Sequence, residues 1–186
     1  MPRACAQARK NIMTTFSPTV SVLFLCMGNI CRSPTAHGVF RHLIRDHGLD
    51  RHVLVDSAGT HNYHPGQPPD DRSQRHAKRR GYDLSDLRAR QITYDDFARY
   101  DLLLAMDWDN LALAEQRCPD EHRHKLRRLT EFCRRHQAAV VPDPYYGGHE
   151  GFEKVLDLIE DACDGLLAHI RQRLTIKSID TSGERA

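Results

Sequence analysis

Short apolar runs alternate with longer segments of helical periodicity along this 186-residue chain. The runs occupy residues 21–26, 53–59, 101–106 and 138–143. Each has the length of a strand, is rich in aliphatic residues and is followed by turn-forming or charged residues, as is typical of buried parallel strands. Strands that alternate with helices form parallel sheets. The pattern therefore predicts an α/β fold, a single-domain three-layer sandwich with a four-stranded parallel sheet and helices on both faces.

Three helices are predicted between and after these runs. The first covers 34–47, with Ser33 as its expected N-cap and Pro34 as its first residue, and its apolar face consists of Val39, Phe40, Leu43 and Ile44. The second lies within 68–81 and ends at Gly81, although its apolar stripe is weak. The third is expected to cover one face of the sheet, because apolar residues recur every three or four positions at Phe152, Val155, Ile159, Cys163, Leu166 and Ile170.

Composition narrows the class of protein but does not define its chemistry. One domain is expected over residues 20–174, while 1–19 and 175–186 lack periodicity and are predicted to be a disordered extension and tail. The formal charge of +2 is too balanced to predict a nucleic-acid partner. The six cysteines are irregularly spaced, and neither a secretory signal nor a membrane-spanning run is visible. We therefore expect a cytoplasmic monomer without membrane insertion.

The string FLCMGNICRSPTA, residues 24–36, carries the candidate chemistry. It joins the first predicted strand to the first predicted helix, where backbone amides and the helix N-terminus converge and favour an anion. The same positive potential is expected to hold Cys26 as a thiolate, while Gly28 permits close backbone approach and Arg32 offers a planar fork for phosphate oxygens. An isolated Cys26 would more simply be a small buried hydrophobe and Arg32 a surface residue. The complete Cys-x5-Arg-Ser-Pro string favours the phosphate loop.

Four motifs extend this interpretation along the chain. The stretches VLFLCMGNICRSP at 22–34, DSAGT at 56–60, RARQIT at 88–93 and DPYYGG at 143–148 resemble the successive motifs of the low-molecular-weight protein tyrosine phosphatases, across roughly residues 20 to 173. The resemblance implies a phosphatase domain that hydrolyses phosphotyrosine monoesters in proteins through a phosphocysteine intermediate. It also implies that neither a metal nor another cofactor takes part.

The resemblance also assigns roles to residues. Cys26 is implied as the nucleophile, Arg32 as the phosphate clamp and Asp143 as the general acid and base. Asn29 and Ser33 match residues that hold the loop, with Ser57 as support, and Cys31 matches a cysteine that forms a reversible disulfide with Cys26. Phosphate or substrate contacts are implied for Met27, Gly28, Asn29, Ile30, Cys31, Ser33, Tyr63, Tyr145 and Tyr146. One departure is that Leu87 and Arg88 stand where the family often has a loop-supporting histidine.

Asp143 and the tyrosines can each be interpreted more simply, without a role in catalysis or substrate binding. Asp143 lies between two prolines that force an extended backbone, and a carboxylic acid there could protonate a departing phenolate, although Asp-Pro is also ordinary turn chemistry. Tyr63 and Tyr145 suit the flat walls of an aryl pocket, although buried core tyrosines are the alternative. Ile30 favours tyrosine, because phosphatases of this family that act on phosphoarginine tend to carry a smaller threonine there.

The sequence gives less support to two other functions and to a role for two further groups of residues. An arsenate reductase on this fold needs two more cysteines near the loop, and Cys118, Cys133 and Cys163 are isolated in the sequence. A phosphate-binding module without catalysis would typically lack one of Cys26, Arg32 and Asp143. The group Cys118, His122, His124, Cys133 and His136 lacks the spacing of common zinc sites, so no metal is predicted. The basic stretches 75–80 and 123–128 are expected to be solvated helix faces, with an acidic protein or a nucleic acid as the alternative partner.

Overall fold

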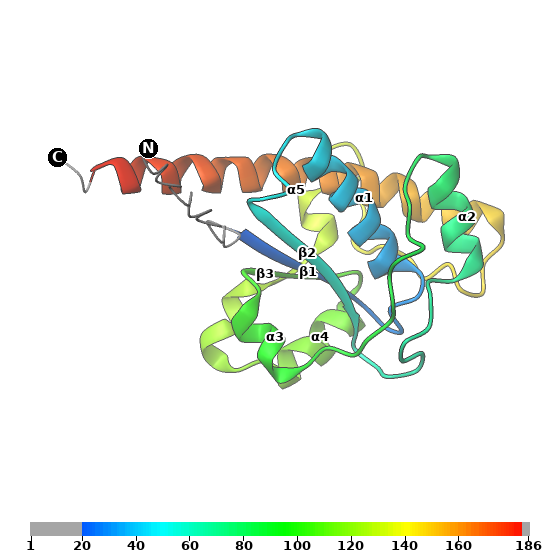
Figure 1. The fold of residues 1–186 in the computed structure, drawn as a ribbon. Helices are drawn as coiled ribbons and strands as arrows, with labels where there is room; N and C mark the ends of the chain where they lie inside the picture. Colours follow the sequence, from blue (N-terminus) through cyan, green and yellow to red (C-terminus); the bar gives the residue numbers. More distant parts are fainter. Residues whose placement is uncertain (1–19, 184–186) are drawn as a thin grey trace, which may run out of the picture.

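A four-stranded parallel sheet organises the protein, as the computed structural model of residues 20–183 shows (Figure 1); side chains are described as far as residue 175. The strands are β1 (Val20–Cys26), β2 (Val53–Gly59), β3 (Leu102–Ala105) and β4 (Leu126–Arg128), in the spatial order β2-β1-β3-β4. Every neighbouring pair is parallel. The carboxyl ends of β1, β2 and β3 therefore meet at one edge, where ligands bind in sheets of this kind.

Helices cover both faces of the sheet, which confirms the predicted three-layer sandwich. One face carries α1 (Arg32–Asp46) and α5 (His149–Gly183), with α2 (Asp71–Arg79) packed against both, and the other face carries α3 (Tyr94–Arg99) and α4 (Trp108–Arg117) (Figure 1). Side chains alternate across a strand, so Val22 and Phe24 of β1 join the core under α1 and α5, whereas Leu23 and Leu25 join the core on the opposite face. Two short 3₁₀ helices, η1 (Asp120–Lys125) and η2 (Leu129–Phe132), flank β4.

The prediction of a fourth strand at 138–143 was wrong. The fourth strand is instead β4, which pairs with β3 through Leu103 and Leu126, and it is too short and too polar to stand out in the sequence. Residues 138–143 have no strand partner, although the Val141 amide donates to the Met106 carbonyl at 2.7 Å. Pro142 has no amide hydrogen with which to continue such pairing. The segment nevertheless runs along the carboxyl edge of the sheet.

The start of α1 also differs from the prediction, whereas the end of α2 agrees with it. Helix α1 begins at Arg32, with Cys31 at the N-cap and no side-chain capping bond. Ser33 is not the cap, because its hydroxyl is engaged by the loop in front of the helix, as described below. Gly81 follows α2 in the left-handed conformation, with φ of 89°, and ends it as predicted.

Helix α5 continues beyond the last apolar position that predicted it. Its backbone is helical to Gly183, so it runs through residues 175–183 of the segment expected to be a disordered tail. Helical hydrogen bonds need no apolar stripe, which is why the pattern does not mark this end. The expected extension 1–19 and the last residues, 184–186, lie outside the described residues. No helix among the described residues combines the length and the apolar character that a membrane crossing requires.

Asp161 of α5 anchors the loop that leads to the segment carrying Asp143. Its side chain is 1% exposed and accepts hydrogen bonds from the amides of Arg134, Arg135 and His136 and from Nδ1 of His136. Burial by itself would raise the pKa of this carboxyl, but the hydrogen bonds outweigh burial and hold the pKa well below its usual range. The ionised carboxylate therefore stabilises the fold.

Asp161→Asn is expected to lower the free energy of unfolding at pH 7 by about 1.5–3 kcal/mol, because a charged acceptor is lost. The folded pKa lies below the unfolded value of about 3.9, so this stabilisation is present above that pH and is lost as the pH falls through the folded pKa. Urea unfolding at stepped pH should show the gap between the two proteins closing from about pH 5 downward. Asp50→Asn, at an exposed position away from this loop, serves as the control. A gap that does not vary with pH would contradict the assignment.

Candidate active site

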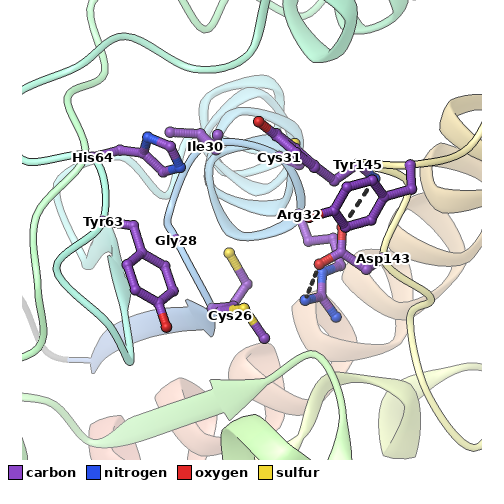
Figure 2. Close-up of a pocket in the computed structure, with 11 residues that line it drawn as sticks. Cys26, Gly28, Ile30, Cys31, Arg32, Tyr63, His64, Asp143 and Tyr145 are labelled. Carbon is purple, nitrogen blue, oxygen red and sulfur yellow. Dashed lines mark hydrogen bonds and ion pairs between the residues drawn. The ribbon is translucent and has the colours of Figure 1, made fainter.

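The loop between β1 and α1 wraps around the sulfur of Cys26, which ends β1. The amide of Asn29 donates to Cys26 Sγ at 3.3 Å, and the hydroxyl of Ser33 lies 3.0 Å from the same sulfur. In Figure 2, Cys26 lies between Tyr63 on one side and Arg32 and Asp143 on the other. An amide and a hydroxyl therefore contact this sulfur beside the start of α1.

Asn29 holds the shape of the loop from behind. Its φ of 57° is left-handed, a conformation that asparagine tolerates better than most residues, and it is 2% exposed. Its side-chain Nδ2 donates to the hydroxyls of Ser33 (2.8 Å) and Ser57 (3.0 Å), while its side-chain Oδ1 accepts from the backbone amide of Arg90 (3.0 Å). The structure thus brings Asn29, Ser33 and Ser57 together as a buried network, and none of the three lines the pocket in front of the loop.

His37 extends this network and was missed from the sequence. Its Nδ1 lies 3.4 Å from the Ser57 hydroxyl, in a buried position on α1. Burial lowers the pKa of His37 to about 4, so the ring is neutral at neutral pH. Leu87, at the position where the family often has a histidine, packs instead with Ala77 and Leu84. The sequence contained one signal that could have identified His37. It lies one helical turn after Ser33, so the two side chains share a face of the helix.

Arg32 is a buried cation held by two carboxylates. It is 2% exposed, and its guanidinium donates to Asp107 (2.5 Å), to Asp143 (2.9 Å) and to the carbonyl of Val141 (3.1 Å). Burial alone would lower the pKa of Arg32, but Cys26 and the two carboxylates raise it instead. Asp107 follows β3, and its other oxygen accepts from the Asn110 amide at the start of α4. The pairing of Asp107 with Arg32 was missed from the sequence.

A cavity of about 300 Å³ opens in front of the loop. It is lined by Cys26, Met27, Gly28, Ile30, Cys31, Arg32, Tyr63, His64, Asp143, Tyr145 and Tyr146. The three tyrosines are exposed rather than core residues, at 60% for Tyr63, 39% for Tyr145 and 97% for Tyr146. His64, which sequence reasoning missed, lies beside Ile30 at the rim (Figure 2). The cavity therefore combines a charged bottom with aromatic walls, as an aryl anion requires.

Cys31 lines the same cavity but differs from Cys26 in its environment. Burial, reinforced by the negative charge of Asp70, raises the pKa of Cys31 to about 12. Cys31 is therefore a protonated thiol at neutral pH. Cys26, by contrast, accepts a hydrogen bond from a loop amide and lies opposite Arg32 (Figure 2).

Within the described part of the chain, the cysteines and histidines from 118 to 136 are not brought together as a set of three potential metal ligands. Among the side chains that the structure describes, one set of three potential metal ligands lies close together, namely His76, His149 and Glu153. It lies outside the cavity that contains Cys26.

Comparison with known proteins places this geometry in one family. A model of the family "Low molecular weight phosphotyrosine protein phosphatase" matches residues 21–176. The human low molecular weight phosphotyrosine protein phosphatase is 41% identical over 151 residues, which cover 80% of this chain and 94% of the relative. A crystal structure of a protein tyrosine phosphatase from Entamoeba histolytica, with Hepes in its active site, has a TM-score of 0.80 and 41% identity, and the match covers 82% of this chain and 97% of that one.

A more distant structure is that of Wzb from Vibrio vulnificus in complex with benzylphosphonate, with a TM-score of 0.70 and 28% identity over 80% of this chain and 97% of that one. The motifs, the sheet order and these matches agree. The chain therefore belongs to the low molecular weight phosphotyrosine protein phosphatases, a family of hydrolases.

Proposed function

We propose that this protein hydrolyses phosphotyrosine monoesters in proteins by a two-step mechanism through a phosphocysteine. One observation carries the proposal: Cys26 Sγ, the Arg32 guanidinium and the Asp143 carboxyl share one cavity of about 300 Å³. In the first step, Cys26 Sγ attacks phosphorus and the P–O bond to tyrosine breaks. Asp143, which takes up a proton from solvent when the substrate phosphate replaces it on Arg32, gives that proton to the departing tyrosine oxygen, which leaves as the neutral phenol.

In the second step, water attacks phosphorus and the P–S bond breaks. Asp143, now a carboxylate, takes the proton from this water, so inorganic phosphate leaves and the Cys26 thiolate returns. Arg32 acts in both steps, because its fork holds equatorial phosphate oxygens on which negative charge is concentrated. The carboxylates of Asp107 and Asp143 support this role, since they fix the guanidinium beside Cys26 before substrate arrives.

The walls of the cavity support an aryl phosphate as substrate. Tyr63 and Tyr145 offer exposed rings on opposite sides of Cys26 (Figure 2), and the related Wzb holds benzylphosphonate, an aromatic phosphate analogue. Ile30 narrows the cavity beside His64. Arsenate reduction by a cysteine relay is not supported, because the described cysteines other than Cys26 and Cys31 do not line the cavity.

Cys26→Ser is expected to reduce hydrolysis of para-nitrophenyl phosphate by roughly 1000-fold or more, because a neutral hydroxyl is a far weaker nucleophile than a thiolate. Binding of inorganic phosphate, measured by calorimetry, should persist. The assay contains a chelator, so that metal-dependent hydrolysis is excluded. Cys118→Ser, which changes a buried thiol on the opposite face of the sheet, is the matched control and should keep its activity. Steady turnover by Cys26→Ser would overturn the assignment of the nucleophile.

Asp143→Asn should slow phosphotyrosine hydrolysis by roughly 100- to 10,000-fold, the usual contribution of a general acid. The variant should lose less of its hydrolysis rate with aryl phosphates that have more acidic leaving groups, because their phenolates depart without a proton. A plot of log rate against leaving-group pKa should therefore be steeper in the variant than in the unmodified protein.

Asp107→Asn is the matched control for this experiment, because Asp107 also binds Arg32 but should not protonate the leaving group. It is expected to slow all the aryl phosphates by a similar factor, without a change of slope. A steep plot for Asp107→Asn beside an unchanged slope for Asp143→Asn would transfer the acid role to Asp107.

A further inference from the structure

A second cavity, of about 220 Å³, lies between α2 and the start of α5. It is lined by Arg72, Arg75, His76, Arg79, Gly147, Gly148, His149 and Phe152, a set with three arginines, two histidines and no carboxylate. Figure 1 shows α2 packed beside the first turns of α5 at one end of the molecule. The cavity is therefore strongly basic, and the mechanism proposed above does not use it.

The spacing of the arginines on α2 creates this surface. Positions 72, 75 and 79 are three and four residues apart, so their side chains share one face of the helix. Arg72 is neutralised by Asp70 at 2.8 Å. Arg75 and Arg79 are exposed, and neither has a carboxylate within 4.0 Å among the described residues. Two positive charges on this face therefore remain without an acidic partner.

The three potential metal ligands beside this cavity are already engaged. Arg79 lies 2.8 Å from His149 Nε2, and His76 Nδ1 lies 2.5 Å from one carboxylate oxygen of Glu153. Arg80 binds the other oxygen of Glu153. The surrounding arginines disfavour a cation, and the start of α5, a long helix that begins at His149, adds positive potential. The ligand that fits this cavity is an anion.

Arg72 connects this cavity with the one that contains Cys26. Its guanidinium donates to the carbonyl of Tyr145 at 2.9 Å and lies 5.4 Å from the centre of the Tyr145 ring and 4.9 Å from that of Phe152. Tyr145 is a wall of the first cavity, and Phe152 lines the second. An anion bound by Arg75 and Arg79 would therefore lie beyond the Tyr145 wall.

We propose that this basic cavity is a subsite for a second anionic group, a carboxylate or a phosphate, on the same polypeptide that presents phosphotyrosine to Cys26. The inference rests on the proposed phosphatase function. Charge complementarity argues for it, because the cavity offers two arginines without a carboxylate partner among the described residues, and Arg72 of the same cavity contacts Tyr145, a wall of the cavity that contains Cys26. The subsite would select substrates through binding and would leave the chemical step unchanged.

The test compares phosphotyrosine peptides that carry one glutamate, placed in turn at one to four residues on either side, with peptides that carry glutamine there. A third arm carries a second phosphate at the best position. The unmodified protein should prefer the glutamate peptide in kcat/KM by roughly three- to tenfold at low salt, and added salt should weaken the preference. A double substitution, Arg75→Glu with Arg79→Glu, should abolish or reverse the preference.

A control with the same change of charge is Arg171→Glu with Arg173→Glu, two exposed positions toward the far end of α5. It should keep the glutamate preference, which separates a local site from a general effect of net charge. Para-nitrophenyl phosphate reports the chemistry independently, because this small ester has no group that reaches the second cavity. If the unmodified protein fails to hydrolyse it, the proposed function is wrong.

Two results would overturn the subsite alone. The first is a protein that hydrolyses para-nitrophenyl phosphate but shows no preference for glutamate or the second phosphate at any position. The second is a preference that survives unchanged in the Arg75 and Arg79 double variant. Tight binding of Zn²⁺ that is lost in His149→Ala would assign the cavity to a metal and would also reject the anion. A larger effect of phosphate than of glutamate would identify doubly phosphorylated substrates.

Discussion

A single buried cation, the guanidinium of Arg32, determines where the other parts of the site must be. Taking a charge out of water costs several kcal/mol unless partners surround it. Here the partners come from two segments that are distant from Arg32 in the chain: Asp107 after β3, and the segment that carries Val141 and Asp143. These segments meet Arg32 because the strands are parallel and their carboxyl ends share one edge. The ion pairs that make burial of Arg32 tolerable therefore also place a carboxyl and a cation on the side of the cavity facing Cys26.

The sequence was informative wherever the signal was local. The run from Cys26 to Arg32 contains both the end of a buried strand and the start of a helix, so its position at the carboxyl edge followed from chain order. Helix α5 and the two-faced sheet followed from periodicity. Asp143 lies in the cavity that contains Cys26 although its segment was wrongly predicted as a strand, because the flanking prolines favour an extended backbone whether or not it pairs.

What the sequence could not reveal depended on contacts between distant segments. Ser33 is an ordinary N-cap residue by type, and only the fold shows that its hydroxyl is taken by Asn29 and Cys26. His37 could have been any helix residue until Ser57 of the next strand was placed beside it. Strand β4 has three residues, and it is a strand because it pairs with β3, not because its own sequence is apolar. Tertiary partners, and not local preference, decide these cases.

The site has a buried part and an exposed part, which differ in how well they tolerate substitution. The bottom, with Arg32, Asn29, Ser33 and Ser57, is almost fully buried, and each polar group there is bonded to another, so a change in any one leaves an unsatisfied partner. The rim consists of the exposed tyrosines Tyr63, Tyr145 and Tyr146. The proposed phosphate chemistry relies on the first part, whose hydrogen bonds hold the loop. The proposed substrate contacts belong to the second part, where exposed side chains are expected to tolerate substitution at little cost in stability. Arg72 binds the carbonyl of Tyr145, a wall of the first cavity, and also lines the basic cavity. A substitution that moves Arg72 is therefore expected to alter both cavities.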